Sequence, residues 1–525
     1  MIVMTAVMLA LFFALMLGVG VSCRQHAKSV DSFVLGGRGV GAWLSAFAFG
    51  TSYFSAVIFV GYAGQFGWNF GLASTWIGLG NAFIGSLLAW SVLGRRTRVM
   101  TQHLGSRTMP DFFGKRFDSN KLKVAASAIV FIFLIPYTAS LYNGLSSLFN
   151  IAFNIPYWVV IVVMSVLTGL YVIFGGYMAT AINDFIQGIV MLGGIVAVIG
   201  AMLVKNGGLT AAIEKLSQVQ SPYPQTAGAQ GAFTSFFGAQ PLYLLFVVVL
   251  TSLGTWGLPQ MVGKFYSIRD EDSIKKGTII STFFAIVVAG GCYFLGGFGR
   301  LYTEQLTNDA STFRKFDAII PTIVSSLPSF IVAIVMVLVL AASMSTLSSL
   351  VLTSSSTLTL DVILMGKKNV DEKKKIRILK IFIVFFIAVS AIIAILKDKY
   401  NFSMIAQMMG VSWGALAGAF LAPFLYGLYW KGTSRVGVAV GFIFGVGLET
   451  AQLLISLGVL PMPSGALGFV FTNSLYSGVF AMVGGLILVP LVSLVTPKSR
   501  PRNVGEMFAC YNETRTVEVT DSLGK

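Results

Sequence analysis

The chain has 525 residues, of which 56% are hydrophobic and only 11% charged, and its mean hydropathy is +0.82. Soluble domains carry about 25% charged residues, so the composition excludes a soluble enzyme and a disordered chain. It also argues against an outer-membrane barrel, whose strands alternate polar and apolar residues. The net charge of +16 would suggest nucleic-acid binding in a soluble protein. Here the basic residues are interpreted as anchors of cytoplasmic loops, and we predict an all-α polytopic membrane protein.

Thirteen apolar runs are each long enough for a membrane-spanning helix, which needs about 20 mostly apolar residues. The ninth run is too long for one straight span, and we expect Pro328 to divide a lead-in at 318–326 from the span itself. Gly175 and Gly176 separate the fifth and sixth runs, which predicts a tight turn. The runs lie near residues 2–22, 41–62, 70–94, 124–150, 156–175, 181–204, 237–262, 278–299, 318–363, 378–396, 402–427, 436–456 and 473–496.

The basic residues predict the orientation. With the N-terminus outside, the inner segments hold 29 of the 36 Lys and Arg residues and the outer segments hold 7. Positive residues concentrate in cytoplasmic loops, so we expect a multi-pass protein of the inner or plasma membrane. Its N-terminus would lie outside and its tail, residues 497–525, in the cytoplasm. The inner segment 263–277 contributes four basic residues, Lys264 among them.

The segments between the runs leave no room for a soluble catalytic domain, since the largest span about 30 residues. A GxxxxGK[ST] loop is missing, so we do not expect ATP to be the energy source. The histidines, His26 and His103, fall in inner loops, and no carboxylate pair or nucleophile–base set appears. We therefore do not expect an enzyme.

The second run is interrupted by small and polar residues. Gly50, Thr51, Ser52 and Ser55 lie together near its middle. Glycine loosens a helix, and serine and threonine satisfy freed backbone groups. This pattern is typical of a broken span or of an ordinary small-residue packing face.

The seventh run carries Gly254, Gly257 and Pro259 within six residues, which makes an uninterrupted helix costly. An unwound stretch there would expose carbonyls that hold a cation and half-helix ends that hold charged groups. Trp256 would either cover a substrate or serve in packing.

The ninth run is rich in hydroxyl groups. Ala342, Ser345 and Thr346 are spaced i, i+3 and i+4, so they share one helix face. Two hydroxyls and a carbonyl on one face suit a hard cation such as Na⁺, which takes oxygen ligands. The alternative is adhesion between helices through Ser and Thr.

Two carboxylates lie well inside the runs, Asp184 and Glu449. Burying either one is costly. Asp184 should lie near the cytoplasmic end of its span, where it would attract a departing cation or pair with a basic loop residue. We assign no role to Glu449.

The two broken runs are five apart in the series, and one starts inside while the other starts outside. This spacing predicts two inverted five-helix halves, the arrangement of secondary transporters that bind at the midplane. We expect residues 1–496 to form one transmembrane domain. Its parts are an extra N-terminal helix at 2–22, a first repeat at 41–204, a second repeat at 237–427 and two further helices at 436–496.

At this point the residues resemble the sodium/solute symporter family, which includes bacterial sodium/proline and sodium/pantothenate symporters. The resemblance runs from about residue 5 to about residue 495. It rests on Phe33–Arg38, on Met109–Phe117, on Gly175-Gly176-Tyr177 with Asp184 and Gln187, and most sharply on Ala341–Ser348.

The resemblance implies a LeuT-like core of five plus five helices with a Na⁺ site between the first broken helix and the ninth span. Carried onto this chain, the ligands are carbonyls of Thr51, Phe54 and Ala342 and the hydroxyls of Ser345 and Thr346. The implied substrate site comprises Ser52, Tyr53, Ser55, Thr251, Thr255, Trp256 and Pro259, and Asp184 is the implied ion-release residue. Tyr53 stands where the sodium/proline symporters have Asp.

We therefore expect a Na⁺-coupled symporter that imports a small organic solute by alternating access. The solute would be an amino acid such as proline or a small carboxylate such as pantothenate. The alternatives are coupling to H⁺ and an uncoupled facilitator or channel on the same fold. The expected partners are Na⁺, the solute and the bilayer, with no nucleic acid and no obligate protein partner. The expected cavity segments offer hydroxyls and aromatic rings but no fixed charge.

Overall fold

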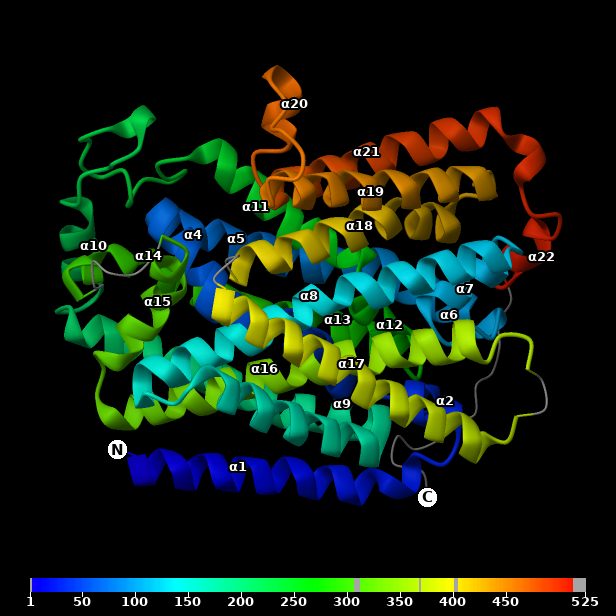
Figure 1. Ribbon diagram of the computed structural model, residues 1–525, viewed down its shortest axis with the longest axis horizontal. Helices are drawn as coiled ribbons and strands as arrows, with labels where there is room; N and C mark the ends of the chain where they lie inside the picture. Colours follow the sequence, from blue (N-terminus) through cyan, green and yellow to red (C-terminus); the bar gives the residue numbers. More distant parts are fainter. Residues whose placement is uncertain (1, 306–311, 368–369, 401–404, 513–525) are drawn as a thin grey trace.

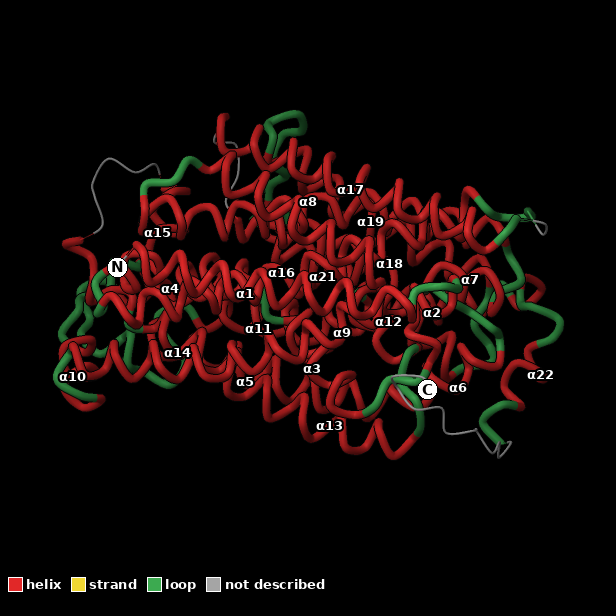
Figure 2. The backbone as a smooth tube through the Cα atoms, turned by 90° about the horizontal axis from the view of Figure 1, so that it is seen from below, coloured by secondary structure: helices red, strands yellow, loops and turns green. Residues whose placement is uncertain are grey.

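A computed structural model describes residues 2–305, 312–367, 370–400 and 405–512 (Figure 1 and Figure 2). Helices dominate these residues, and the strand-like pairing described in them is one isolated bridge between Val40 and Ile268. An all-α protein agrees with the composition, because a backbone in a bilayer satisfies its polar groups within each helix.

The helix bounds follow the predicted runs closely. The α-helices are α1 Ile2–Ser22, α2 Val30–Leu35, α3 Ala42–Tyr53, α4 Ala63–Phe70, α5 Thr75–Gly80, α6 Arg95–His103, α7 Met109–Arg116, α8 Asn120–Phe153, α9 Tyr157–Lys205, α10 Leu209–Ser217, α11 Pro241–Leu253, α12 Pro259–Tyr266, α13 Glu271–Ala285, α14 Gly291–Gly297, α15 Thr312–Ser325, α16 Ser329–Leu358, α17 Glu372–Tyr400, α18 Ile405–Tyr429, α19 Arg435–Ser456, α20 Gly465–Val470, α21 Ser474–Val495 and α22 Val504–Ala509. Short 3₁₀ and π segments join or extend them: η1 Cys23–His26, η2 Gly36–Arg38, η3 Val57–Tyr62, η4 Gly71–Ser74, η5 Asn81–Leu88, η6 Trp90–Gly94, η7 Pro224–Thr226, η8 Gly254–Gly257, η9 Ile286–Gly290, η10 Gly299–Gln305, η11 Thr359–Ile363 and η12 Pro497–Ser499.

Ten helices among the described residues are long and apolar enough to cross a membrane, and the bent pair Pro241–Gly257 and Pro259–Tyr266 raises the number to eleven. Two of the ten contain a backbone break. The stretch Val57–His103 is interrupted at Gly71 (φ 63°, ψ −140°), and α9 is interrupted at Gly176 (φ 56°, ψ −146°). The number of thirteen spans stays a prediction.

The break at Gly176 folds α9 back on itself. Tyr171 donates a hydrogen bond to the carbonyl of Met344, and Gly194 lies against the side chain of Leu338. On a straight helix, residues 171 and 194 would be about 35 Å apart, yet their contacts on α16 are separated by six residues. The positive φ of Gly176 favours glycine, so the predicted tight turn at this dipeptide is confirmed.

The helices form one bundle, with α1 along one edge and α19 and α21 along the opposite edge (Figure 1). The N-terminus of α1 and α10 lie at one end of the bundle, whereas α6, α7 and α22 lie at the other end (Figure 1 and Figure 2). α16 and α18 are the most enclosed long helices, with 83% and 94% of their apolar windows buried, against 22% for α1. α16, which carries the hydroxyl-rich sequence, therefore lies in the interior.

The two broken spans each pack against a span of the other half of the chain. α3 and α4 lie along α13 and α14, whereas α11 lies along α5 and η5. α8 packs on α18, and α9 packs on α16. The contact between α4 and α14 is a backbone contact, because a Cβ added at Gly67 would lie 2.0 Å from the carbonyl carbon of Gly296.

Two details differ from the predicted boundaries, and a third agrees with them. The second span does not end at residue 62 but continues through η3 and α4 to Phe70. The inner segment predicted at 263–277 begins later, because α12 extends to Tyr266 and buries Lys264. Pro328 does divide the ninth run, since α15 ends at Ser325 and α16 begins at Ser329.

Candidate functional site

The break in the second span lies at Phe54, three residues after Thr51. α3 ends at Tyr53, and Phe54 is extended (φ −99°, ψ 102°) before the helix resumes after Ser55. Gly50 still accepts the backbone hydrogen bond of Phe54, whereas Ser55 accepts those of Ile58 and Phe59 and so begins the next segment. The predicted interruption is therefore present, and it leaves the last carbonyls of α3 free for other partners.

Four oxygens gather beside this break. The carbonyl of Thr51 lies 3.1 Å from the hydroxyl of Ser345 and 3.2 Å from that of Thr346. Both hydroxyls also lie 3.1 Å from the carbonyl of Ala342. All four residues are at most 1% exposed. The structure thus brings together four of the five predicted Na⁺ ligands, from helices about 300 positions apart in sequence.

The chemistry of this oxygen cluster suits a cation. Two hydroxyls supply only two protons, so at most two of the four short oxygen contacts are hydrogen bonds, and lone pairs face each other at the others. Carbonyl and hydroxyl oxygens are the ligands of hard cations. The fifth predicted ligand, the carbonyl of Phe54, is not part of this oxygen cluster. The ring of Phe54 stacks on that of Tyr53, with ring centroids 4.6 Å apart.

A chain of hydrogen bonds continues one helical turn along α16. The hydroxyls of Ser52 and Ser349 are 2.8 Å apart, and the ammonium of Lys264 donates to Ser349 at 2.9 Å. Lys264 is 4% exposed. Its ammonium also lies 3.5 Å from a carboxylate oxygen of Asp184, which is fully buried, and 5.3 Å from the ring centre of Tyr177.

Asp184 therefore pairs with a basic residue, the second of the two expectations for it. Its partner is not in a loop, and sequence reasoning missed Lys264 because the residue was placed in an inner segment. The available signal was its position, five residues after Pro259 and among the apolar Met261, Val262 and Phe265. That pattern indicates a helix that continues past the lysine. The expectation that no fixed charge lies near the cavity segments is wrong for this reason.

Several of the predicted substrate residues have hydrogen-bond partners within the protein, and two of them, Thr255 and Trp256, contact the third span. The Tyr53 hydroxyl donates to the Thr251 carbonyl at 2.5 Å. The Thr255 hydroxyl donates to the Gly85 carbonyl at 3.3 Å, and the Trp256 indole donates to the Ile84 carbonyl at 3.0 Å. The hydroxyl of Thr251 donates to its own helix, and Ser55 is buried at the first break.

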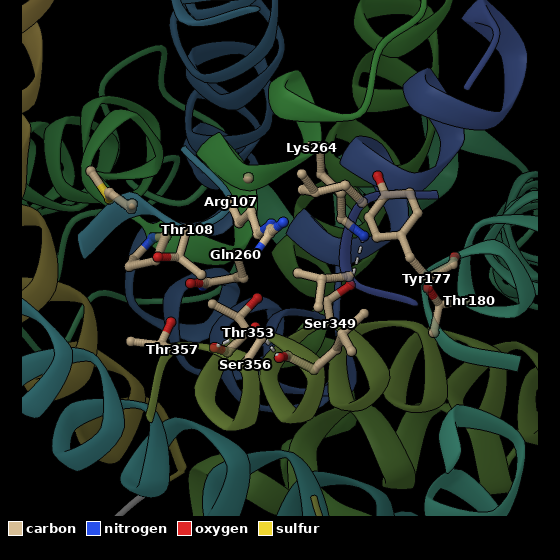
Figure 3. Close-up of a pocket in the computed structure, with 16 residues that line it drawn as sticks. Arg107, Thr108, Tyr177, Thr180, Gln260, Lys264, Ser349, Thr353, Ser356 and Thr357 are labelled. Atoms are coloured by element: carbon tan, nitrogen blue, oxygen red, sulfur yellow. Dashed lines mark hydrogen bonds between the residues drawn. The ribbon is translucent and has the colours of Figure 1, made fainter. Parts of the chain in front are cut away.

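Pro259 is the predicted substrate residue that lines a described cavity, which lies between α12 and α16 (Figure 3). The cavity has a volume of about 50 Å³, roughly the space of four water molecules. Gln260 and Arg107 lie toward one side in Figure 3, and Lys264, Ser349 and Tyr177 toward the other. The lining residues are Val34, Leu35, Arg107, Thr108, Met109, Tyr177, Thr180, Pro259, Gln260, Gly263, Lys264, Ser349, Leu352, Thr353, Ser356 and Thr357.

A network of charged residues lies beyond Thr108, near the end of α16. Lys123 bridges two carboxylates, at 2.7 Å from Asp111 and 3.2 Å from Asp361, and Thr108 donates to Asp361. Burial raises the pKa of Asp111, but the charges of Lys123 and Lys115 outweigh it and hold the pKa below its ordinary value. The network joins the segment 95–123 to the end of the hydroxyl-rich helix.

The buried Glu449 has a partner outside these sites. It accepts a hydrogen bond from Ser477 at 2.8 Å, and its carboxylate lies against Gly414. It therefore joins α19 to α18 and α21 and takes no part in the oxygen cluster.

Comparison with known proteins adds family information to this geometry. The model of the sodium:solute symporter family matches residues 33–445. The sodium/proline symporter of Staphylococcus aureus is 27% identical over 453 residues, which cover 84% of each chain. Sodium/proline symporter 2 of Staphylococcus saprophyticus is 27% identical over 454 residues, again 84% of each chain. A solved structure of a Na⁺-coupled sialic acid symporter has a TM-score of 0.71 at 18% identity and covers 94% of this chain and 98% of its own. That structure supports the fold alone.

Proposed function

Because the chain belongs to the sodium:solute symporter family, we propose that it imports one small organic solute together with Na⁺ by alternating access. The observation that carries this proposal is the oxygen cluster of Thr51, Ala342, Ser345 and Thr346, where a broken helix meets the hydroxyl-rich helix. A bound Na⁺ would accept lone pairs from these oxygens and hold α3 against α16.

The proposed site has no carboxylate among its ligands, so a bound ion would be held weakly and could be released. Occupancy of the ion site would stabilise the contact between α3 and α16 and allow the core to rock inward. Asp184 would attract the departing ion only after Lys264 moves away with α12, because the lysine ammonium now faces that carboxylate.

We also propose thirteen spans and an inverted five-plus-five core. Division of Val57–His103 at Gly71 and of α9 at Gly176 supports that number. The reciprocal packing of the two broken spans supports the repeat, since each one lies against a span of the other half. The repeats would comprise residues 41–204 and 237–427, with the N-terminus outside and the C-terminal tail in the cytoplasm.

The proposed solute is an amino acid such as proline or a small carboxylate such as pantothenate. The named function of the Staphylococcus relatives supports proline as one candidate. Two alternatives are H⁺ coupling and an uncoupled facilitator. Tyr53 in place of an acidic residue argues against a proton carrier at the first break.

The energy available from one Na⁺ sets the size of the expected effect. One charge that crosses about 100 mV releases about 2.3 kcal/mol. This corresponds to a roughly 40-fold accumulation of solute before any chemical Na⁺ gradient is added.

The test is uptake of labelled solutes into proteoliposomes with an inward Na⁺ gradient. The panel comprises proline and other amino acids, pantothenate, acetate and sugars. We expect accumulation of one solute above equilibrium, and its loss when choline replaces Na⁺. Accumulation driven by a proton gradient alone would indicate H⁺ coupling. Entry of the solute only to equilibrium, at the same rate with and without Na⁺, would indicate a facilitator.

A further inference from the structure

The cavity between α12 and α16 carries two cations and no carboxylate in its lining. Lys264 and Arg107 are the basic residues among the lining residues, none of which is Asp or Glu. Asp184 and Asp31, which pair with them, lie outside the lining. Each cation therefore has one carboxylate partner outside the lining, and the groups that face the cavity are hydrogen-bond donors and not acidic residues.

The ammonium of Lys264 is not fully used by its protein partners. Its 3.5 Å distance from Asp184 is longer than the roughly 2.7–2.9 Å of a direct ammonium–carboxylate hydrogen bond. An ammonium has three donors, and Ser349 accepts one of them. A donor is thus available to a group in the cavity.

One turn before Lys264, Gln260 presents an amide without a partner. The residue is 2% exposed, and neither its side-chain oxygen nor its nitrogen has a hydrogen-bond partner. The buried hydroxyl of Thr357, which also lines the cavity, has none either. Positions 260 and 264 are spaced i and i+4, so both side chains lie on the same face of α12. Unpaired buried polar groups are unfavourable, and together these groups indicate a missing ligand.

We propose that this cavity is an inner binding site for the carboxylate group of the transported solute, with the Lys264 ammonium and the Gln260 amide as donors. Val34, Leu35, Met109 and Leu352 give it apolar walls, which suit a solute with an apolar body. Its volume of about 50 Å³, the space of roughly four water molecules, leaves room for a group of a few heavy atoms such as a carboxylate. A sugar or polyol has no charge for Lys264 to bind. This assignment rests on the proposed function in naming the transported solute as the occupant and in taking this side of the protein as the inner one.

The test is direct binding of labelled acetate, proline and pantothenate to the purified full-length protein in Na⁺, with mannitol as the uncharged probe. We expect at least one carboxylate probe to bind more tightly than mannitol. Gln260→Leu should weaken that binding about tenfold, since it removes a hydrogen bond to a charged group. Gln260→Glu should weaken it further, because it places a negative charge in the cavity.

Thr180→Val is the matched control. Thr180 lines the same cavity, but its hydroxyl already donates to the Tyr177 carbonyl at 2.7 Å. We expect affinity within about twofold of the parent, because the lost bond is not one to the ligand. The inner site is wrong if no carboxylate binds more tightly than mannitol, or if Gln260→Leu behaves like Thr180→Val.

Uptake measured on the same preparations separates this inference from the proposed function. If a solute is accumulated with Na⁺ but binds equally tightly to the parent and to Gln260→Leu, the inner site is wrong and symport still holds. If Gln260→Leu abolishes carboxylate binding but the parent shows no Na⁺-driven accumulation, symport is wrong and the inner site still holds.

Discussion

The two broken spans use their interruptions differently. At the first break, the freed carbonyl of Thr51 meets two hydroxyls of α16, and the group contains only oxygens. At the second break, Thr255 and Trp256 donate to carbonyls of η5, so their polar groups are already paired. Below that break, α12 carries a buried lysine and an unpaired amide toward the cavity. Two similar interruptions therefore expose a cluster of oxygens in one case and a helix end that carries charge in the other.

The largest expected effect comes from the charge on α12. Lys264→Met leaves Asp184 buried without a counter-charge, which should destabilise the protein by about 3–5 kcal/mol. We expect a clear fall in the thermal unfolding midpoint in detergent and a partial recovery in the double variant Lys264→Met with Asp184→Asn. Lys276→Met removes an exposed lysine paired with Asp272 and should leave the midpoint unchanged. An equal midpoint for Lys264→Met and Lys276→Met would contradict a close buried pair.

The next effect tests the first break as an ion site. Ser345→Ala or Thr346→Ala removes one oxygen ligand and should raise the Na⁺ concentration for half-maximal uptake about tenfold. The solute concentration for half-maximal uptake, at saturating Na⁺, should change much less. Ser343→Ala is the control, because that hydroxyl donates to the Val339 carbonyl of its own helix. A Ser345→Ala or Thr346→Ala variant with the parental Na⁺ requirement would exclude that hydroxyl as an ion ligand.

A smaller effect tests whether the second break has a structural role. Thr255→Val removes a hydrogen bond to the Gly85 carbonyl and should cost about 1 kcal/mol of stability. The Na⁺ requirement for uptake should stay at the parental value. If it rises as far as in Ser345→Ala, the second break also contributes to ion binding, and the contrast between the two breaks fails.

The smallest effect concerns the charged network beyond the cavity. The folded pKa of Asp111 is lowered, so its contribution to stability is complete above the unfolded pKa and is lost as the pH falls through the folded pKa. The difference in unfolding midpoint between the parent and Asp111→Asn should hold from pH 7 to about pH 5 and shrink below about pH 4. Asp118→Asn, at a residue with a 78% exposed carboxylate paired with Arg435, should show no such difference. If the difference in unfolding midpoint between the parent and Asp111→Asn already disappears between pH 7 and pH 5, the pKa of Asp111 is not lowered.

Features set by local sequence could be predicted. Ser345 and Thr346 share a face with Ala342 because helix geometry fixes that spacing, and Gly176 and Pro328 mark a turn and a boundary through their backbone preferences. The position of Thr51 beside them came from the family resemblance, since no local rule joins residues so far apart in sequence. The pairing of Lys264 with Asp184 and of Trp256 with the third span depends on tertiary packing. The unpaired amide of Gln260 has no sequence signal at all.

The backbone contact between Gly67 and Gly296 has a mechanical consequence. Because no side chain separates them at this point, the main chains of α4 and α14 are in direct contact, which opposes sliding of one helix along the other. We expect these two segments to travel as one rigid body through the transport cycle. The contact that changes would then lie elsewhere in the bundle, for example between α12 and α16, which line the cavity. Two glycines would thus fix one contact between the two halves of the chain, about which the remaining helices would move.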